Sequence, residues 1–168
     1  MNDYKMVFLD TEFTDLLDPR LISIGFVSEC GEELYIEIPF AIRHCSEFVR
    51  EAVLPQLGKV PEAFCLTPLL RERILTYLAR VRAGEGDIII AYDYSTDWWL
   101  LYEALDQTIP RWVSNALVWS DLSELLIEDY WKKTGESQHH ALHDARANRY
   151  AYRPKPLNTV TDAKSQAS

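Results

Sequence analysis

The order of its apolar and polar segments is the feature that most restricts the fold of this chain. Three short β-rich runs come first and lie close together, at residues 4–10, 21–27 and 33–38. Runs of this kind with turn residues between them predict an antiparallel three-stranded meander. Beyond residue 46, segments with helix signals alternate with short apolar runs, which is typical of strands joined by crossover helices. The sequence therefore predicts an α/β fold with a mixed central sheet, antiparallel meander plus parallel strands, flanked by helices.

The later segments carry recognisable start and stop signals. Ser46 can cap a short helix that runs through Leu54. Thr67-Pro68 places a proline in the first turn of a second helix, which should reach about Arg82. The remaining predicted elements are a buried strand of the parallel kind at 88–92, a helix at 96–105, a strand at 116–119, a helix at 121–133 capped by Asp121, a loop at 135–138 and a last helix at 140–152.

The bulk properties favour one domain without a membrane segment. At 168 residues the chain can bury a proper core, and we expect this domain to span residues 1–153, with a flexible tail at 154–168. No apolar run is long enough to span a bilayer, and the first residues lack the layout of a secretion signal. Three cysteines without Cys-x-x-Cys spacing favour a reduced, cytoplasmic protein.

The first apolar run closes with an Asp-x-Glu pair, Asp10 and Glu12. Residues two apart in a strand point to the same side, so both carboxylates should lie on one face at the carboxyl end of the strand. In open α/β sheets that end is where ligands bind. Such a pair can contribute to holding two divalent cations, and a carboxylate-rich set favours Mg²⁺ or Mn²⁺. Taken alone, a solvated strand end in an acidic chain would look the same.

Two further acidic fragments lie far from the first. Asp93 ends the buried strand, whereas Asp97 begins the next helix, where the helix macrodipole favours a negative charge whatever its function. The third fragment contains His139, His140, His143 and Asp144. His140 and Asp144 are four residues apart and would share a helix face, so His140 could support that carboxylate. A zinc site made of the three histidines would lack cysteines and a fitting spacing.

Together, Asp10-Thr11-Glu12, Asp97 and the pair His139 and Asp144 resemble the DEDDh 3′–5′ exonucleases, which include RNase T, oligoribonuclease and polymerase proofreading subunits. In length, the chain is most similar to a small bacterial 3′–5′ exoribonuclease family first recognised in mycobacteria. Segments 15–25 and 139–147 look typical of that family, and the resemblance spans residues 4 to about 152. It implies an RNase H-like fold.

The resemblance also implies a role for each site residue. Asp10, Glu12, Asp97 and Asp144 would hold two Mg²⁺ or Mn²⁺ ions, and His139 would be the general base. Because five residues on a helix are about 140° apart, His139 must lie on the loop before the last helix. The family register selects Asp97 as the ligand. Asp93, where the family often has Asn, would then contribute indirectly, and His140 is a second indirect candidate.

The same resemblance implies how substrate is held. Thr11, Glu12 and His139 would contact the terminal nucleotide, and Phe13 would stack on or wedge beside the terminal bases. Phe13 could equally be a core aromatic residue. The five tryptophans, at positions 98, 99, 112, 119 and 131, are expected in the core or at an interface. Tyr92-Asp93 departs from the His-Asn often seen in the family, a difference that concerns substrate contacts rather than catalysis.

The activity implied is that of a metal-dependent exonuclease that acts on the 3′ ends of single-stranded RNA, or of DNA, and releases nucleoside 5′-monophosphates. The net charge of -9 argues against tight binding of long polymers but is compatible with trimming of ends. Two alternatives stay open: a catalytically inert RNase H-like module that binds nucleotides or protein, and a phosphodiesterase acting on small nucleotides. No membrane contact is expected, and a homodimer is one option for the assembly.

Overall fold

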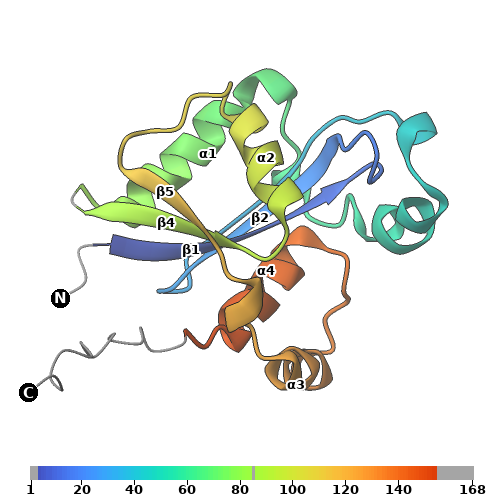
Figure 1. The fold of residues 1–168 in the computed structure, drawn as a ribbon. Coiled ribbons are helices and arrows are strands. Elements are labelled where there is room, and N and C mark those ends of the chain that lie inside the picture. Colours follow the sequence, from blue (N-terminus) through green and yellow to red (C-terminus); the bar gives the residue numbers. More distant parts are fainter. Residues whose placement is uncertain (1–3, 85, 155–168) are drawn as a thin grey trace, which may run out of the picture.

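A five-stranded mixed sheet forms the centre of the protein (Figure 1). The structure is a computed structural model and describes residues 4–84 and 86–154. The strands are β1 (Tyr4–Phe13), β2 (Leu21–Ser28), β3 (Glu33–Glu37), β4 (Asp87–Tyr92) and β5 (Val113–Leu117), in the order β3-β2-β1-β4-β5. β1–β2 and β2–β3 are antiparallel, whereas β1–β4 and β4–β5 are parallel. The predicted meander with added parallel strands is therefore confirmed.

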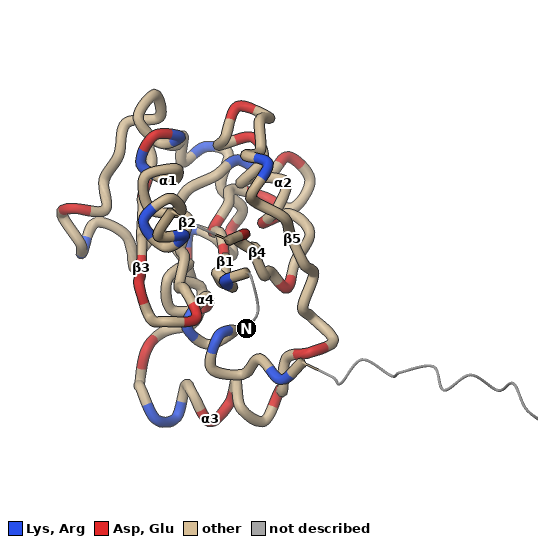
Figure 2. Tube along the Cα trace, turned by 90° about the vertical axis from the view of Figure 1, so that its left-hand side faces the viewer, with Lys and Arg blue, Asp and Glu red and all other residues tan. Residues whose placement is uncertain are grey.

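Helices cover both faces of this sheet (Figure 1). α1 (Thr67–Arg82) and α2 (Ser95–Ala104) lie on one face, and α4 (Ala141–Ala151), with α3 (Glu124–Thr134) packed against it, lies on the other. Short helical turns complete the fold: the 3₁₀ helices η1 (Ile42–His44), η3 (Leu54–Gln56), η4 (Pro61–Ala63) and η5 (Trp119–Asp121), and the π-helix η2 (Val49–Val53). Charged residues of both signs are spread over these elements (Figure 2).

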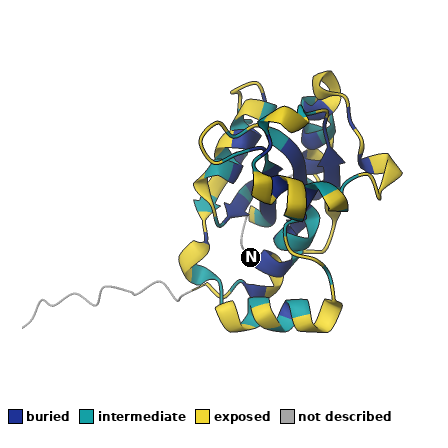
Figure 3. Ribbon diagram, turned by 90° about the vertical axis from the view of Figure 1, so that its right-hand side faces the viewer, coloured by how far each residue is buried: buried dark blue, intermediate teal, exposed yellow. Residues whose placement is uncertain are grey.

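The largest core lies between the sheet and α1. Fully buried strand residues such as Leu9, Ile24 and Ile88 pack there with Ile74 and Leu78 of α1. Ile74 and Leu78 are four residues apart and therefore lie on one face of α1, which explains why this segment folds as a helix against the sheet. Figure 3 shows the buried residues along the strands and the exposed ones on the outer helix faces and loops.

The opposite face is packed unusually closely because small residues meet there. Gly25 of β2 is paired with Asp10 of β1, and α4 crosses directly over it. A Cβ atom at Gly25 would lie 2.5 Å from backbone atoms of Ala141 and Leu142, so only glycine permits this approach. α4 itself contributes buried alanines to the contact. The consequence is that the first turn of α4 is held beside Asp10.

Several predicted boundaries agree with the structure and others do not. α1 has the predicted bounds, and the last helix differs from its prediction by one residue at each end. β1 continues to Phe13, three residues past the predicted end, because the polar segment still pairs with β2. The helical segment that follows Ser46 contains a π-helix rather than a regular α-helix, although the Ser46 hydroxyl does accept a hydrogen bond from the N–H of Val49.

The region between β4 and α3 was predicted less well. The strand expected at 116–119 lies at Val113–Leu117, and the residues after it form the 3₁₀ helix η5. Asp121 was expected to cap the next helix, but it lies in η5, and α3 begins at Glu124. Parallel pairing with β4 explains the shifted strand, since it fixes the register from Val113 onward.

Two expectations concern the chain ends and membranes. The predicted flexible tail falls, apart from Pro154, outside the described residues. Within residues 4–84 and 86–154, no helix combines the length and the apolar character that a bilayer crossing requires.

Candidate functional site

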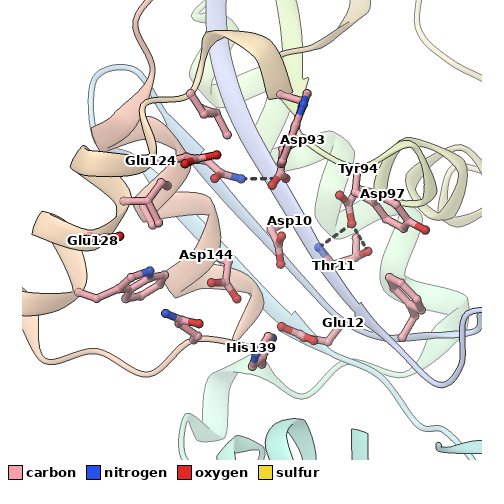
Figure 4. Close-up of a pocket in the computed structure, with 18 of the residues that line it drawn as sticks. Asp10, Thr11, Glu12, Asp93, Tyr94, Asp97, Glu124, Glu128, His139 and Asp144 are labelled. Atoms are coloured by element: carbon pink, nitrogen blue, oxygen red, sulfur yellow. Dashed lines mark hydrogen bonds between the residues drawn. The ribbon is translucent and has the colours of Figure 1, made fainter. Parts of the chain in front are cut away.

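A cavity of about 900 Å³ opens at the carboxyl ends of β1 and β4, between α2, α3 and α4 (Figure 4). Its described lining includes seven carboxylates and no Lys or Arg. The carboxylates are Asp10, Glu12, Asp93, Asp97, Glu124, Glu128 and Asp144. The three acidic fragments singled out in the sequence therefore meet in one place, at the sheet edge where α/β proteins bind ligands.

Two overlapping groups of carboxylates could each hold a cation. Oxygen atoms of Asp10, Glu12 and Asp144 lie within 4.8 Å of one another, and so do those of Asp10, Asp93 and Asp97. Asp10 belongs to both groups. All the donors are carboxylate oxygens, which suit hard divalent cations such as Mg²⁺ and Mn²⁺. The set can therefore hold two ions that share Asp10.

Backbone geometry places the first group. Asp10 and Glu12 lie two residues apart in β1 and so share a face, as the sequence predicted. Asp144 lies in the first turn of α4, which Gly25 allows to approach β1. The backbone N–H of His140 donates a hydrogen bond to Asp144 Oδ2 at 3.1 Å. The carboxylate of Asp144 is thus oriented by the start of its own helix.

Asp97 is the most deeply buried of the predicted ligands, with 2% of its surface exposed. Its Oδ1 accepts hydrogen bonds from the Thr11 hydroxyl at 2.6 Å and from the Thr11 N–H at 3.2 Å. Its Oδ2 is buried and has no hydrogen-bond partner among the described residues. A buried oxygen left unpaired is costly, so this atom is suited to a cation. Thr11 orients Asp97, and its predicted contact with substrate stays a prediction.

Asp93 lies at the end of β4 and also faces the cavity (Figure 4). Its Oδ1 accepts a hydrogen bond from Asn148 Nδ2 at 2.9 Å. The sequence left open whether Asp93 or Asp97 is the ligand. The structure brings both carboxylates to Asp10, so the two residues are not mutually exclusive as ligands.

Burial and mutual repulsion raise the pKa values of the carboxyl groups. Burial, followed by the charges of Asp97, Asp144 and Glu12, raises the pKa of Asp10 well above its usual value. Burial raises the pKa of Glu12 to about 8 and those of Asp97 and Asp144 to about 7. Acids crowded in this way ionise reluctantly on their own, whereas a bound cation favours the charged form. The electrostatics therefore fit a metal centre.

His139 lies on the loop before α4, where the sequence analysis required it, and lines the cavity near Glu12 and Asp144 (Figure 4). Its backbone is in the left-handed region, with φ of 62°, which a non-glycine residue seldom adopts. The side-chain amide of Gln56 donates hydrogen bonds to two backbone carbonyl oxygens of this loop. The N···O distances are 2.9 Å to His139 and 2.6 Å to Gln138. The His139 ring packs edge-on against Phe48, with centroids 4.8 Å apart.

The other two histidines of the fragment lie away from the cavity lining. The buried ring of His140 stacks between Tyr35 and His143, with centroids 4.4 and 4.0 Å away, and burial lowers its pKa to about 4. Asp144 is therefore supported by the backbone N–H of His140 and not by its imidazole, which was the group that the sequence suggested. Within the described ranges, the groups able to hold a metal contain carboxylates and no histidine, which disfavours the zinc alternative.

Aromatic side chains form much of the remaining cavity wall. Phe13 stacks on Tyr94, with centroids 6.5 Å apart and planes within 10°, and both line the cavity. Trp119 and Trp131 line it as well, so neither is simply a core residue, and their predicted place at an interface stays a prediction. By contrast, Trp98 does pack against the main core, as expected.

Three further residues of the cavity wall, Tyr94, Phe48 and Asn148, were not predicted from the sequence. Only Tyr94 is adjacent to an acidic motif, so a wider reading of the segment after β4 could have included it. The i,i+4 spacing from Asp144 could likewise have indicated Asn148, whereas Phe48 reaches the cavity through the tertiary fold and nothing in its local sequence marks it.

The fold is similar to that of a solved nuclease. Comparison with the crystal structure of cell-death related nuclease 4 (CRN-4) gives a TM-score of 0.51 and 12% sequence identity, over 89% of this chain and 63% of that chain. The protein thus spans less than two thirds of that nuclease, and at this identity the likeness concerns the fold. It agrees with the predicted RNase H-like architecture. No protein-family model matches the sequence, and a search of curated proteins finds no relative.

Proposed function

We propose that this protein is a metal-dependent 3′–5′ exonuclease. It hydrolyses phosphodiester bonds at the 3′ end of single-stranded nucleic acid, RNA rather than DNA, and releases nucleoside 5′-monophosphates. The observation that carries the proposal is the convergence of Asp10, Glu12, Asp97, Asp144 and His139, from three segments far apart in the sequence, on one cavity. The fold shared with a nuclease supports it.

Two Mg²⁺ or Mn²⁺ ions would be held by Asp10, Glu12, Asp97 and Asp144. The unpaired oxygen of Asp97 and the raised pKa values of the four acids support this assignment. Bound in pairs, such ions supply a nucleophilic hydroxide near neutral pH and stabilise the charge of the leaving oxygen. The chain contributes the fixed positions of the carboxylates, through Thr11 on Asp97 and the His140 N–H on Asp144.

His139 is positioned to act as general base. It is partly exposed at the cavity wall, so its imidazole can accept a proton from a water in the cavity and pass it to solvent. The stacked pair of Phe13 and Tyr94 offers a flat surface to the terminal bases, and stacking of this kind tolerates any base. Thr11 and Glu12 would contact the terminal nucleotide from β1.

The charge of the cavity supports action at chain ends. Lys and Arg usually track the phosphates of a bound polymer, and neither residue type lines the described part of this cavity. Only the few nucleotides nearest the cations would then be gripped. The same feature favours the second candidate function, a phosphodiesterase that acts on small nucleotides. The complete five-residue set argues against an inert binding module, since a lapsed site would be expected to lose a ligand.

The test uses 5′-labelled RNA and DNA of equal sequence, together with dinucleotides, each in Mg²⁺, Mn²⁺ or EDTA. The proposal predicts shortening of RNA in either metal, slower shortening of DNA, and no product in EDTA. Cleavage of dinucleotides alone would establish the phosphodiesterase instead. Full activity in excess EDTA, or no cleavage of any substrate in either metal, would refute the nuclease assignment.

A further inference from the structure

Asp93 occupies a different chemical position from the one its sequence context suggested. As the residue where the resembling family often has Asn, it was expected to act indirectly. In the structure its carboxylate lines the cavity, and one of its oxygens lies within 4.8 Å of oxygens of Asp10 and Asp97. Its oxygen therefore meets the same 4.8 Å limit from Asp10 as the oxygens of Glu12 and Asp144 in the first carboxylate group.

The hydrogen bonds of Asp93 and Asp97 follow one pattern. On each carboxylate, a protein donor binds Oδ1: the Thr11 hydroxyl on Asp97 at 2.6 Å and the Asn148 amide on Asp93 at 2.9 Å. The second oxygen of Asp97 is buried and has no partner in the described part of the chain. Proteins orient metal-binding carboxylates in this way: a hydrogen-bond donor from the protein holds one oxygen, and the other oxygen can bind the metal.

Asn148 is placed to hold Asp93 in this way. Its residue surface is 5% exposed, and it lies on α4 one helical turn after Asp144, so both side chains face the cavity. This hydrogen bond, from the Asn148 amide on α4 to Asp93, is drawn as a dashed line at Asp93 in Figure 4. The helix that supplies Asp144 to the first carboxylate group thus also orients a member of the second.

We propose that Asp93 binds the second divalent cation directly, together with Asp10 and Asp97, and that Asn148 is the positioning residue that aims Asp93. The proposal rests on the two-cation function given above and adds a ligand to it. An Asn side chain at position 93 would bring a neutral oxygen, whereas Asp93 brings a charge. Mg²⁺ sites with one or two carboxylates usually complete their coordination with substrate phosphates. With three carboxylates, the second cation would bind before any substrate arrives.

The experiment is a Mn²⁺ titration of the full-length protein without nucleic acid, followed by electron paramagnetic resonance and calorimetry. The wild type should bind two equivalents. Asp93→Asn should keep one site unchanged and weaken the other by at least about 10-fold, and Asn148→Ala should weaken the same site by about 10–100-fold. Glu124→Gln is the control, because Glu124 lines the same cavity but belongs to neither carboxylate group. It should change the Mn²⁺ affinity of either site by no more than a few-fold.

The outcomes separate this inference from the proposed function. A wild type that binds no Mn²⁺ would contradict the metal-dependent function itself. A wild type that binds a single equivalent, or an Asp93→Asn variant that binds two as tightly as wild type, would overturn the inference and leave that function standing. Asp93→Asn is nearly isosteric, so the test remains decisive even if Asn148→Ala does not fold.

Discussion

The individual carboxylates of this cavity would bind the cations, but they destabilise the metal-free protein when they are ionised. Burial, together with the nearby charges of Asp97, Asp144 and Glu12, raises the pKa of Asp10 well above its usual range. Burial also raises the pKa of Glu12 to about 8 and those of Asp97 and Asp144 to about 7. With raised folded-state pKa values, the unfolded chain loses its protons first as the pH rises, so stability falls between about pH 4 and pH 8. The metal-free protein should therefore be less stable near neutral pH than near pH 5, and Mg²⁺ or Mn²⁺ should reverse this trend.

The variant that tests this balance is Asp10→Asn. It should abolish cleavage, because Asp10 belongs to both carboxylate groups, and yet raise the Tm of the metal-free protein at about pH 8. One pKa unit corresponds to about 1.4 kcal/mol, which moves Tm by about 3–6 °C in a chain of this size. Thermal unfolding in EDTA at the two pH values measures the effect. Undiminished turnover, or a lower Tm near pH 8, would contradict it.

A second residue-scale prediction separates the three histidines. His139→Ala should reduce kcat by about 10²–10⁴-fold, because the general base is lost, while Mn²⁺ binding stays unchanged. His143→Ala is the matched control and should retain activity. If His140→Ala or His143→Ala proves the crippling change instead, the assignment of His139 is wrong.

For single residues, the sequence was informative where the spacing of two residues in a strand or helix determines the direction of their side chains. The period of two in a strand placed Asp10 and Glu12 on one face, and the helix period placed His139 on a loop. Spacing could not choose between Asp93 and Asp97, because both reach Asp10 only through the packing of α2 and β4. Phe48 and Trp119 likewise reach the cavity from segments whose local sequence carries no mark of a site.

Among the elements, the segment around η2 and η3 contacts the loop that carries His139, the proposed general base. Gln56 follows the π-helix and donates from its side chain to the carbonyl oxygen of His139, whose φ is 62°. π-helices are rare and are often found at functional sites. The sequence predicted a short regular helix here, because a π-helix has no distinctive local pattern.

Gln56→Glu removes the amide donor but keeps the shape of the side chain. Without this donor the loop should leave its left-handed conformation, so kcat should fall by about tenfold, since misplacement by about 1 Å is costly to catalysis. KM and the stoichiometry of Mn²⁺ binding should stay as in wild type. Gln107→Glu, at an exposed position far along the chain, is the control. A change in KM with kcat intact would show that Gln56 acts on substrate rather than on His139.

For the molecule as a whole, the charge balance sets how nucleic acid is held. The chain has 17 Lys and Arg against 26 Asp and Glu, and Figure 2 shows the basic positions spread over several elements. Binding of single strands weakens with salt by a slope of about −0.7 for each phosphate contacted. We expect a slope of about −1 for 1/KM on RNA, with rates independent of length beyond the terminal nucleotides. A slope steeper than about −3 would reveal a phosphate-tracking surface.

The architecture was predictable because the order of strands and helices along the chain nearly determines it. Three consecutive short strands form a meander, and a strand that follows a crossover helix adds in parallel. The sequence did not reveal that β4 joins the sheet beside β1, which brings Asp93 next to Asp10. Nor did it reveal the close contact of α4 with Gly25, because that contact depends on a residue distant in sequence.

The most direct test of the proposed function is the order and identity of the products released from a short RNA labelled at its 5′ end. In Mg²⁺ or Mn²⁺, the account predicts a ladder of fragments that all keep the 5′ label and shorten step by step, together with unlabelled nucleoside 5′-monophosphates identified by mass spectrometry. Early release of the labelled 5′ nucleotide, internal fragments without intermediates, or nucleoside 3′-monophosphates would contradict it.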